Sequence, residues 1–164
     1  MKINNIITEI IENDIKSMDM LNEYSENYKH LSADKIMDKL NENEDYKKLS
    51  EQNKINRDNL AYYLQNSTIL LTGKDSDNGF AVDMAKVKKD NSYALFIYTD
   101  LDEINEDTQY IEVNYTDLRD YIISSKEIKR IIINKNSVNA ILGKSNFIRG
   151  NMYGLLIKNK LELE

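Results

Sequence analysis

The chain has no cysteine, no proline and no tryptophan, and only one histidine and five glycines among its 164 residues. Without cysteine it can form no disulfide, no thiolate metal site and no cysteine nucleophile, a composition that fits a reducing compartment. A single histidine, His30, excludes a histidine-rich zinc site and any relay that uses two imidazoles within one chain. These absences remove several common classes of catalytic and metal site.

Long apolar runs are also missing. No run approaches the roughly 20 residues that are needed to cross a bilayer. The acidic residues Glu9, Glu12 and Asp14 interrupt the apolar pattern of the N-terminal segment, so it lacks the uninterrupted core of a secretory signal. We therefore expect a cytoplasmic protein that does not bind membranes.

The charge balance is acidic. The chain has 22 Lys and Arg residues against 28 Asp and Glu residues, and its formal net charge is −6. This charge opposes non-specific attraction to phosphate backbones and to anionic lipid headgroups. Nucleic acid is thus not an expected partner, whereas a basic protein would be attracted.

Residues 1–66 are expected to be mostly helical. Apolar residues recur there at spacings of three and four, which predicts an amphipathic helix to about residue 28. The residues of this stripe are Ile3, Ile7, Ile10, Ile11, Met18 and Leu21. Ser32 is a candidate N-cap for a second helix. Two further short helices are predicted, one around Tyr46 and Leu49 and another over Arg57–Gln65.

After residue 66 the apolar period changes to two, which is typical of strands. Tyr93–Tyr98 is apolar on both faces and is therefore predicted to be a central strand. The other expected elements are strands at Thr68–Thr72, Phe80–Met84 and Tyr110–Asn114, a polar loop at residues 73–79, a helix at Thr116–Ser124, a hairpin of Arg130–Asn134 with Val138–Leu142, and a final helix capped by Ser145.

This order predicts an α+β fold, with a mixed or antiparallel sheet and short helices, preceded by an N-terminal helical region. We divide the chain into a helical extension, residues 1–56, and an α+β domain, residues 57–162.

An acidic cluster follows the predicted central strand in the sequence SYALFIYTDLDEIN, residues 92–105. Asp100 is placed to cap a helix whose third residue is Glu103, as in a variant of the capping box, and Asp102 would also lie at the positive end of that helix. Acid and base catalysis would instead need one desolvated carboxyl in a cleft. The polar residues that follow indicate open solvent, so capping is the preferred interpretation.

Three short motifs imitate ligand-binding loops. LTGKD has Asp75 where a phosphate loop needs Ser or Thr, and VNAILGKS has Val138 where the loop needs its first glycine. KDSDNGF resembles a calcium loop, yet Phe80 stands where glycine must turn the chain and Lys86 where the bidentate Glu belongs. We interpret all three as turns or strand ends and expect neither a metal nor a cofactor.

Four segments are similar to the N-terminal domain of the SseB family: LAYYLQNSTILLTG, ALFIYTDLDEI, YIEVNYTDLRDYI and RIIINKNSVNAIL. Tyr98, Thr99 and Asp100 match a family step at the end of a strand, with Tyr in place of the usual Phe. Asn134 matches a later Asn, although Lys135 replaces the proline that follows it. The resemblance covers about residues 57–150 and implies a compact bacterial α+β module without an established catalytic centre.

Two functional hypotheses follow. The first is a non-enzymatic cytoplasmic protein-interaction module, for example an adaptor or immunity protein that masks a basic partner. The second is a small-ligand-binding protein or enzyme that uses the acidic cluster. The candidate residues for either are Tyr98, Thr99, Asp100, Asp102 and Glu103. A homodimer through the Ile3–Leu21 stripe is a further possibility.

Overall fold

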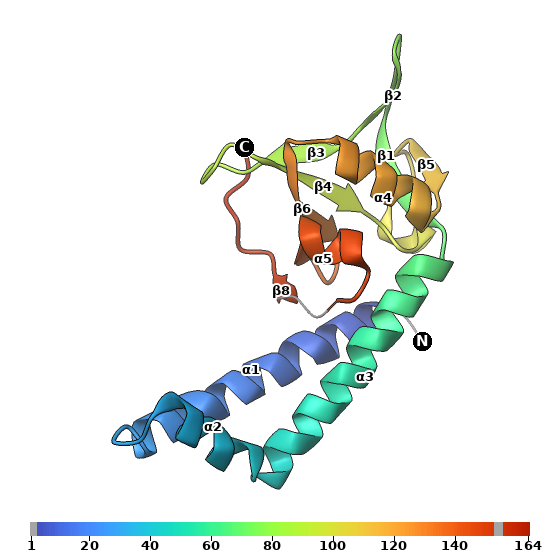
Figure 1. Cartoon of the computed structure of the whole chain (residues 1–164). Coiled ribbons are helices and arrows are strands. Elements are labelled where there is room, and N and C mark those ends of the chain that lie inside the picture. The colour runs from blue at the N-terminus through green and yellow to red at the C-terminus, as the bar shows by residue number, and fades with distance from the viewer. Residues whose placement is uncertain (1–2, 153–155) are drawn as a thin grey trace.

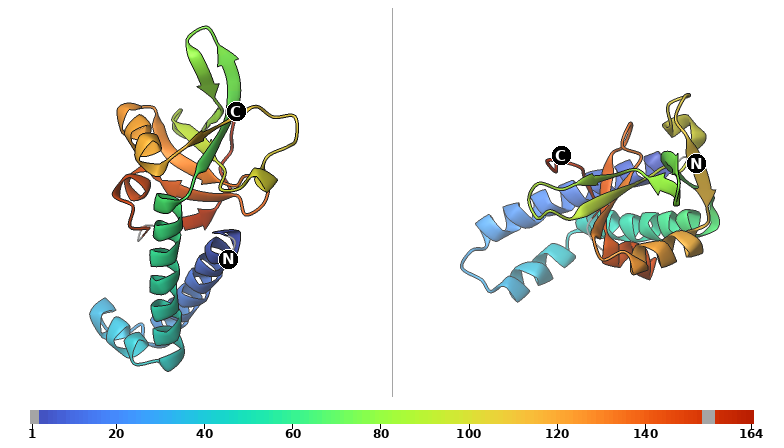
Figure 2. Two further views of the ribbon diagram at one scale, coloured as in Figure 1. Left: turned by 90° about the vertical axis from the view of Figure 1, so that its right-hand side faces the viewer. Right: turned by 90° about the horizontal axis from the view of Figure 1, so that it is seen from above.

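The computed structural model describes residues 3–152 and 156–164. Three helices come first: α1 (Ile3–Asn27), α2 (Ala33–Asn41) and α3 (Glu44–Asn66). Figures 1 and 2 show them as an arm that extends from the sheets, with α1 and α3 running in opposite directions. Ser32 caps α2 by accepting from the Lys35 amide, as predicted, and Asn43 caps α3 in the same way.

Helix α3 is continuous where two short helices were predicted, so the expected division between residues 56 and 57 falls inside one helix. Two of its buried positions hold Asn53 and Asn56, which conceals the apolar period in the sequence. Asn53 donates to the Ile10 carbonyl at 2.9 Å and accepts from Asn13 at 3.1 Å. These polar contacts satisfy amides that would otherwise be buried without partners.

The strands form two sheets. The larger has the order β3 (Met84–Lys86), β4 (Tyr93–Ile97), β6 (Ile128–Ile133), β7 (Ala140–Gly143) and β8 (Leu156–Lys158). Strands β4 and β6 are parallel and the other pairs are antiparallel. The predicted α+β class, with a mixed sheet, is confirmed. Strand β4 lies inside this sheet, as its apolar sequence indicated.

The smaller sheet has the order β2 (Gly79–Val82), β1 (Ile69–Ser76) and β5 (Tyr110–Val113). The predicted polar loop at residues 73–79 is wrong, because β1 continues to Ser76 and forms a hairpin with β2. This hairpin projects from the end of the molecule opposite the helical arm (Figure 1). The predicted strand over Phe80–Met84 is divided, since β2 and β3 belong to different sheets.

Two helices follow the strands: α4 (Tyr115–Ser124) and α5 (Lys144–Arg149). Ser145 does not cap α5. The N-cap is Gly143, which has no side chain to accept a hydrogen bond, because β7 runs directly into the helix. Between β4 and β5, the 3-10 helix η1 (Leu101–Glu103) begins where the acidic cluster predicted a helix start.

One hydrophobic core joins the helical arm to the sheets. Ile6, Ile7 and Ile10 of α1 are buried together with Leu60 and Leu64 of α3 and with apolar residues of both sheets. Much of the predicted dimer stripe is thus already buried within the chain. Farther along α1, Ile15 and Met18 stay exposed, and only this distal part remains for a second copy.

Within the described ranges, no helix is both long enough and apolar enough to cross a membrane.

Candidate functional site

The acidic cluster begins at the end of β4. Asp100 has an extended backbone, and its carboxylate accepts from the amide of Asp102 at 3.0 Å. This bond satisfies an amide at the start of η1 that has no partner within the helix. The predicted capping role of Asp100 is confirmed.

Glu103 has a different role from the predicted one. Its carboxylate does not turn back to Asp100 as in a capping box but accepts from Asn4 of α1 at 2.7 Å and from the Ser137 hydroxyl at 2.6 Å. Asn4 also donates to Ser137 at 2.9 Å, which closes a triangle of side chains. Partners that are 99 and 34 residues away in sequence therefore hold this carboxylate.

Asn134 joins this triangle to the end of β4. Its side chain is fully buried, accepts from the Thr99 amide at 3.0 Å, and donates to the Thr99 hydroxyl and to Asn4, both at 2.8 Å. Its backbone has φ of 51°, a region that Asn tolerates better than most residues. We call Asn4, Thr99, Glu103, Asn134 and Ser137 the Asn134 network.

Sequence reasoning singled out Asn134 only through the family resemblance, and it missed Asn4 and Ser137. The one local signal is an Asn directly after the apolar run of β6, where a left-handed turn residue is expected. No local signal links Asn4 to a strand end some 95 residues away, since only tertiary folding brings them together.

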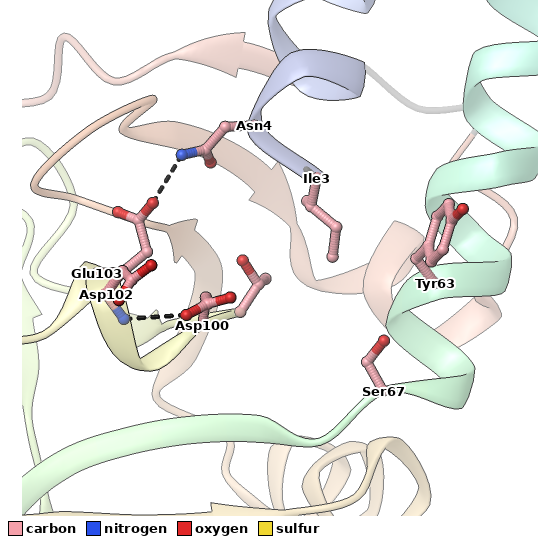
Figure 3. A pocket seen from close by; sticks show the side chains of 8 residues that line it. Ile3, Asn4, Tyr63, Ser67, Asp100, Asp102 and Glu103 are labelled. Carbon is pink, nitrogen blue, oxygen red and sulfur yellow. Dashed lines mark hydrogen bonds between the residues drawn. The ribbon is translucent and has the colours of Figure 1, made fainter. Parts of the chain in front are cut away.

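A cavity of about 310 Å³ lies where α1, α3 and the end of β4 meet. Its lining residues are Ile3, Asn4, Tyr63, Ser67, Thr99, Asp100, Asp102 and Glu103, and we call it the acidic hollow. Figure 3 shows the three acids on one side, with Tyr63 and Ser67 facing them from the other. None of these lining residues is Lys, Arg or His, so the three carboxylates have no cation beside them within the hollow.

Tyr98 does not join the other four candidate residues. Successive side chains of a strand point to opposite faces, so Tyr98 lies in a second, smaller hydrophobic core with Leu70, Phe96 and Ile132, while Thr99 faces the acidic hollow. Burial raises the pKa of Tyr98 above its ordinary value, and the nearby negative charge of Asp83 raises it further. A hydrogen bond with Thr72 partly offsets this rise. Tyr98 is therefore a core residue with a polar tip.

The arrangement suits the binding of a cation better than acid and base chemistry. Asp100 uses one carboxylate oxygen and Glu103 uses both in structural hydrogen bonds, whereas the exposed side chain of Asp102 takes part in no described hydrogen bond. His30 follows the far end of α1, and a helix of 25 residues is about 37 Å long. It therefore cannot act as a base here. Across the described ranges, no group of three or more Asp, Glu or His side chains is arranged to hold a metal ion.

Comparison with known proteins provides no family for this chain. No protein-family model matches it, and neither does any curated protein or solved structure. The resemblance to the SseB family therefore stays a prediction, and the function has to be inferred from the side chains of the acidic hollow.

Proposed function

We propose that the chain is a cytoplasmic, non-enzymatic protein-interaction module of the SseB-like type, which binds a basic protein as an adaptor or immunity protein would. The observation that carries this proposal is the acidic hollow, where Asp100, Asp102 and Glu103 line one side of a cavity with no basic residue among its lining. A Lys or Arg side chain of the partner enters the hollow and supplies the missing charge.

The Asn134 network supports this role because it fixes Glu103, and the backbone next to Asp100, before any partner arrives. Glu103 is held from two sides, and the Thr99 amide next to Asp100 is held by Asn134. A preorganised site loses less conformational entropy on binding than a flexible one. The ring of Tyr63 on the opposite wall offers a surface on which a cationic group can stack.

The overall charge also favours a basic partner. A net charge of −6 attracts a cationic protein over several ångströms and raises the rate of encounter, while the hollow selects the side chain that docks. This long-range attraction decreases as salt rises, because the Debye length is about 8 Å at physiological ionic strength.

The alternative is a site for a small cationic ligand. The concave shape of the hollow and its mixture of carboxylates, hydroxyls and one aromatic ring favour an organic amine as that ligand. An enzyme would need a carboxyl that is free to exchange protons, and two of the three acids are occupied by structural hydrogen bonds.

The test is affinity capture from extracts of the cells that produce the protein, with Asp102→Lys as the informative variant. Asp102 is exposed in the first turn of η1, so its replacement disturbs no described side-chain hydrogen bond. Asp34→Lys is the matched control, since Asp34 is also an exposed acid in the first turn of a helix, α2. Both variants change the net charge equally.

The expected result is one stoichiometric basic protein that the wild type and Asp34→Lys retain and Asp102→Lys loses. If both variants lost the partner equally, net charge alone would drive binding. If all three proteins retained the partner, the hollow would not be part of the interface. A small amine that co-purifies with the wild type, without a protein partner, would favour the alternative.

A further inference from the structure

The smaller sheet has one apolar face that the rest of the chain covers incompletely. Directly opposed residues of antiparallel strands project to the same face. The pairs Leu71 with Ile111 and Gly73 with Val82 therefore share a face, and Phe80 joins them through its pairing with Asp75. Phe80, Val82 and Ile111 are only half-buried there.

Helix α4 borders this face and turns it into a groove. Leu118 and Tyr121, one turn apart on the helix, line a cavity of about 240 Å³ together with the apolar residues of the sheet. We call it the small-sheet groove; its lining is Leu71, Phe80, Val82, Ile111, Val113, Asp117, Leu118 and Tyr121. Figure 1 shows α4 beside β1 and β5, near the base of the projecting hairpin.

Gly73 gives the groove part of its depth. A Cβ atom at this position would lie 2.9 Å from the Phe80 ring and 2.0 Å from the Ala81 carbonyl oxygen. The missing side chain thus lets the Phe80 ring lie across β1. This packing holds an aromatic wall in place on the projecting hairpin.

The charges on the groove are acidic. Asp117 is the one charged residue of the lining. Asp75 lies on the same face of the sheet, directly opposite Phe80 across the hairpin. A mostly apolar floor with carboxylates at its border is complementary to a segment that carries apolar side chains beside Lys or Arg.

We propose that the small-sheet groove binds a cationic amphipathic segment of another protein. Its apolar side chains pack against Phe80, Val82 and Tyr121, and its basic side chains reach Asp75 and Asp117. The groove and the acidic hollow share no lining residue, so this proposal does not depend on the hollow. A second copy is disfavoured as occupant, since a two-fold contact places a patch against itself and would bring these carboxylates together.

The test uses a short fluorescein-labelled synthetic peptide built from Leu and Lys at helical spacing, titrated with the full chain and followed by fluorescence anisotropy. Tyr121→Ala is the informative variant and Tyr110→Ala the matched control. Both tyrosines are 40% exposed, but Tyr110 of β5 is one residue away from Ile111 and projects to the opposite face.

We expect Tyr121→Ala to weaken binding about tenfold, as loss of an aromatic anchor does, and Tyr110→Ala to change it less than about twofold. Asp117→Asn should weaken binding and reduce its salt dependence. On titration with the peptide, the amide resonances of Phe80 and Val82 should shift, whereas those of α2 should not.

Three results would overturn the proposal. One is equal binding by the two tyrosine variants, and another is equal binding of a peptide in which Glu replaces every Lys. The third is a dimer of the full chain, detected by sedimentation, that Tyr121→Ala dissociates, because a second copy would then occupy the groove. Circular dichroism of each variant confirms that its fold is intact before binding is measured.

Discussion

Replacing Asn134 by Ala should destabilise the protein far more than its small change in volume indicates. Asn134 is fully buried and makes three side-chain hydrogen bonds, two with Thr99 and one with Asn4. Each such bond contributes about 1 kcal/mol net, and a left-handed backbone costs Ala about 1 kcal/mol. The free energy of unfolding should therefore fall by about 4 kcal/mol.

Two further variants separate these contributions. Asn134→Gly removes the same hydrogen bonds but tolerates φ of 51°, so it should recover about 1 kcal/mol of the loss. Asn91→Ala is the control, because Asn91 has φ of 59° but is exposed, and it should cost only about 1 kcal/mol.

Urea unfolding followed by circular dichroism measures all of these changes. For a chain of this size, 1 kcal/mol corresponds to about 2–4 °C in Tm. If Asn134→Ala lowered the free energy of unfolding no more than Asn91→Ala does, the Asn134 network would not stabilise the fold. The network would then not preorganise the acidic hollow either.

Two other predictions concern acid stability and cooperativity. Hydrogen bonds from Arg130, and to a smaller extent from Ser92, hold the pKa of the Asp90 carboxyl well below its usual range. The ionised Asp90 carboxylate therefore stabilises the fold fully above its unfolded pKa of about 3.9, and this stabilisation is lost as pH falls toward the folded pKa. Without it, the urea midpoint of Asp90→Asn should decline less steeply below about pH 4 than that of the wild type. An equally steep decline in both proteins would contradict this. Leu60→Ala, in the core shared by helices and sheets, should cost about 2–5 kcal/mol. Far-ultraviolet dichroism and tyrosine fluorescence should still give one transition, whereas two separate midpoints would mean that the helical arm unfolds independently.

Local patterns determined most of the individual elements. The three-four spacing of isoleucines predicted α1, Ser32 predicted the start of α2, and the apolar sequence of β4 predicted a strand inside the sheet. Asp100 predicted the helix start after β4. Each of these signals depends on residues within about one helical turn or one strand, where backbone geometry and capping act directly.

Patterns failed where buried polar residues interrupt the apolar period or where strands pair in preference to forming loops. Because Asn53 and Asn56 interrupt the apolar period, the sequence predicted two short helices in place of α3. Their hydrogen bonds let both side chains lie at buried positions of one helix. Gly73 indicated a loop, whereas pairing with β2 keeps it in a strand. Both outcomes depend on partners that a local pattern does not contain.

The candidate site was decided almost entirely by tertiary structure. The sequence by itself supplied the acids and their order, but the acidic hollow exists because α1 and α3 bring Asn4 and Tyr63 to the end of β4. The same folding gives Glu103 partners from distant segments, and it places Tyr98 in a hydrophobic core while Thr99 lines the hollow. The physical reason is range: capping and periodicity act between neighbours along the chain, whereas a cavity and its hydrogen bonds need groups that meet only after the helices pack on the sheets.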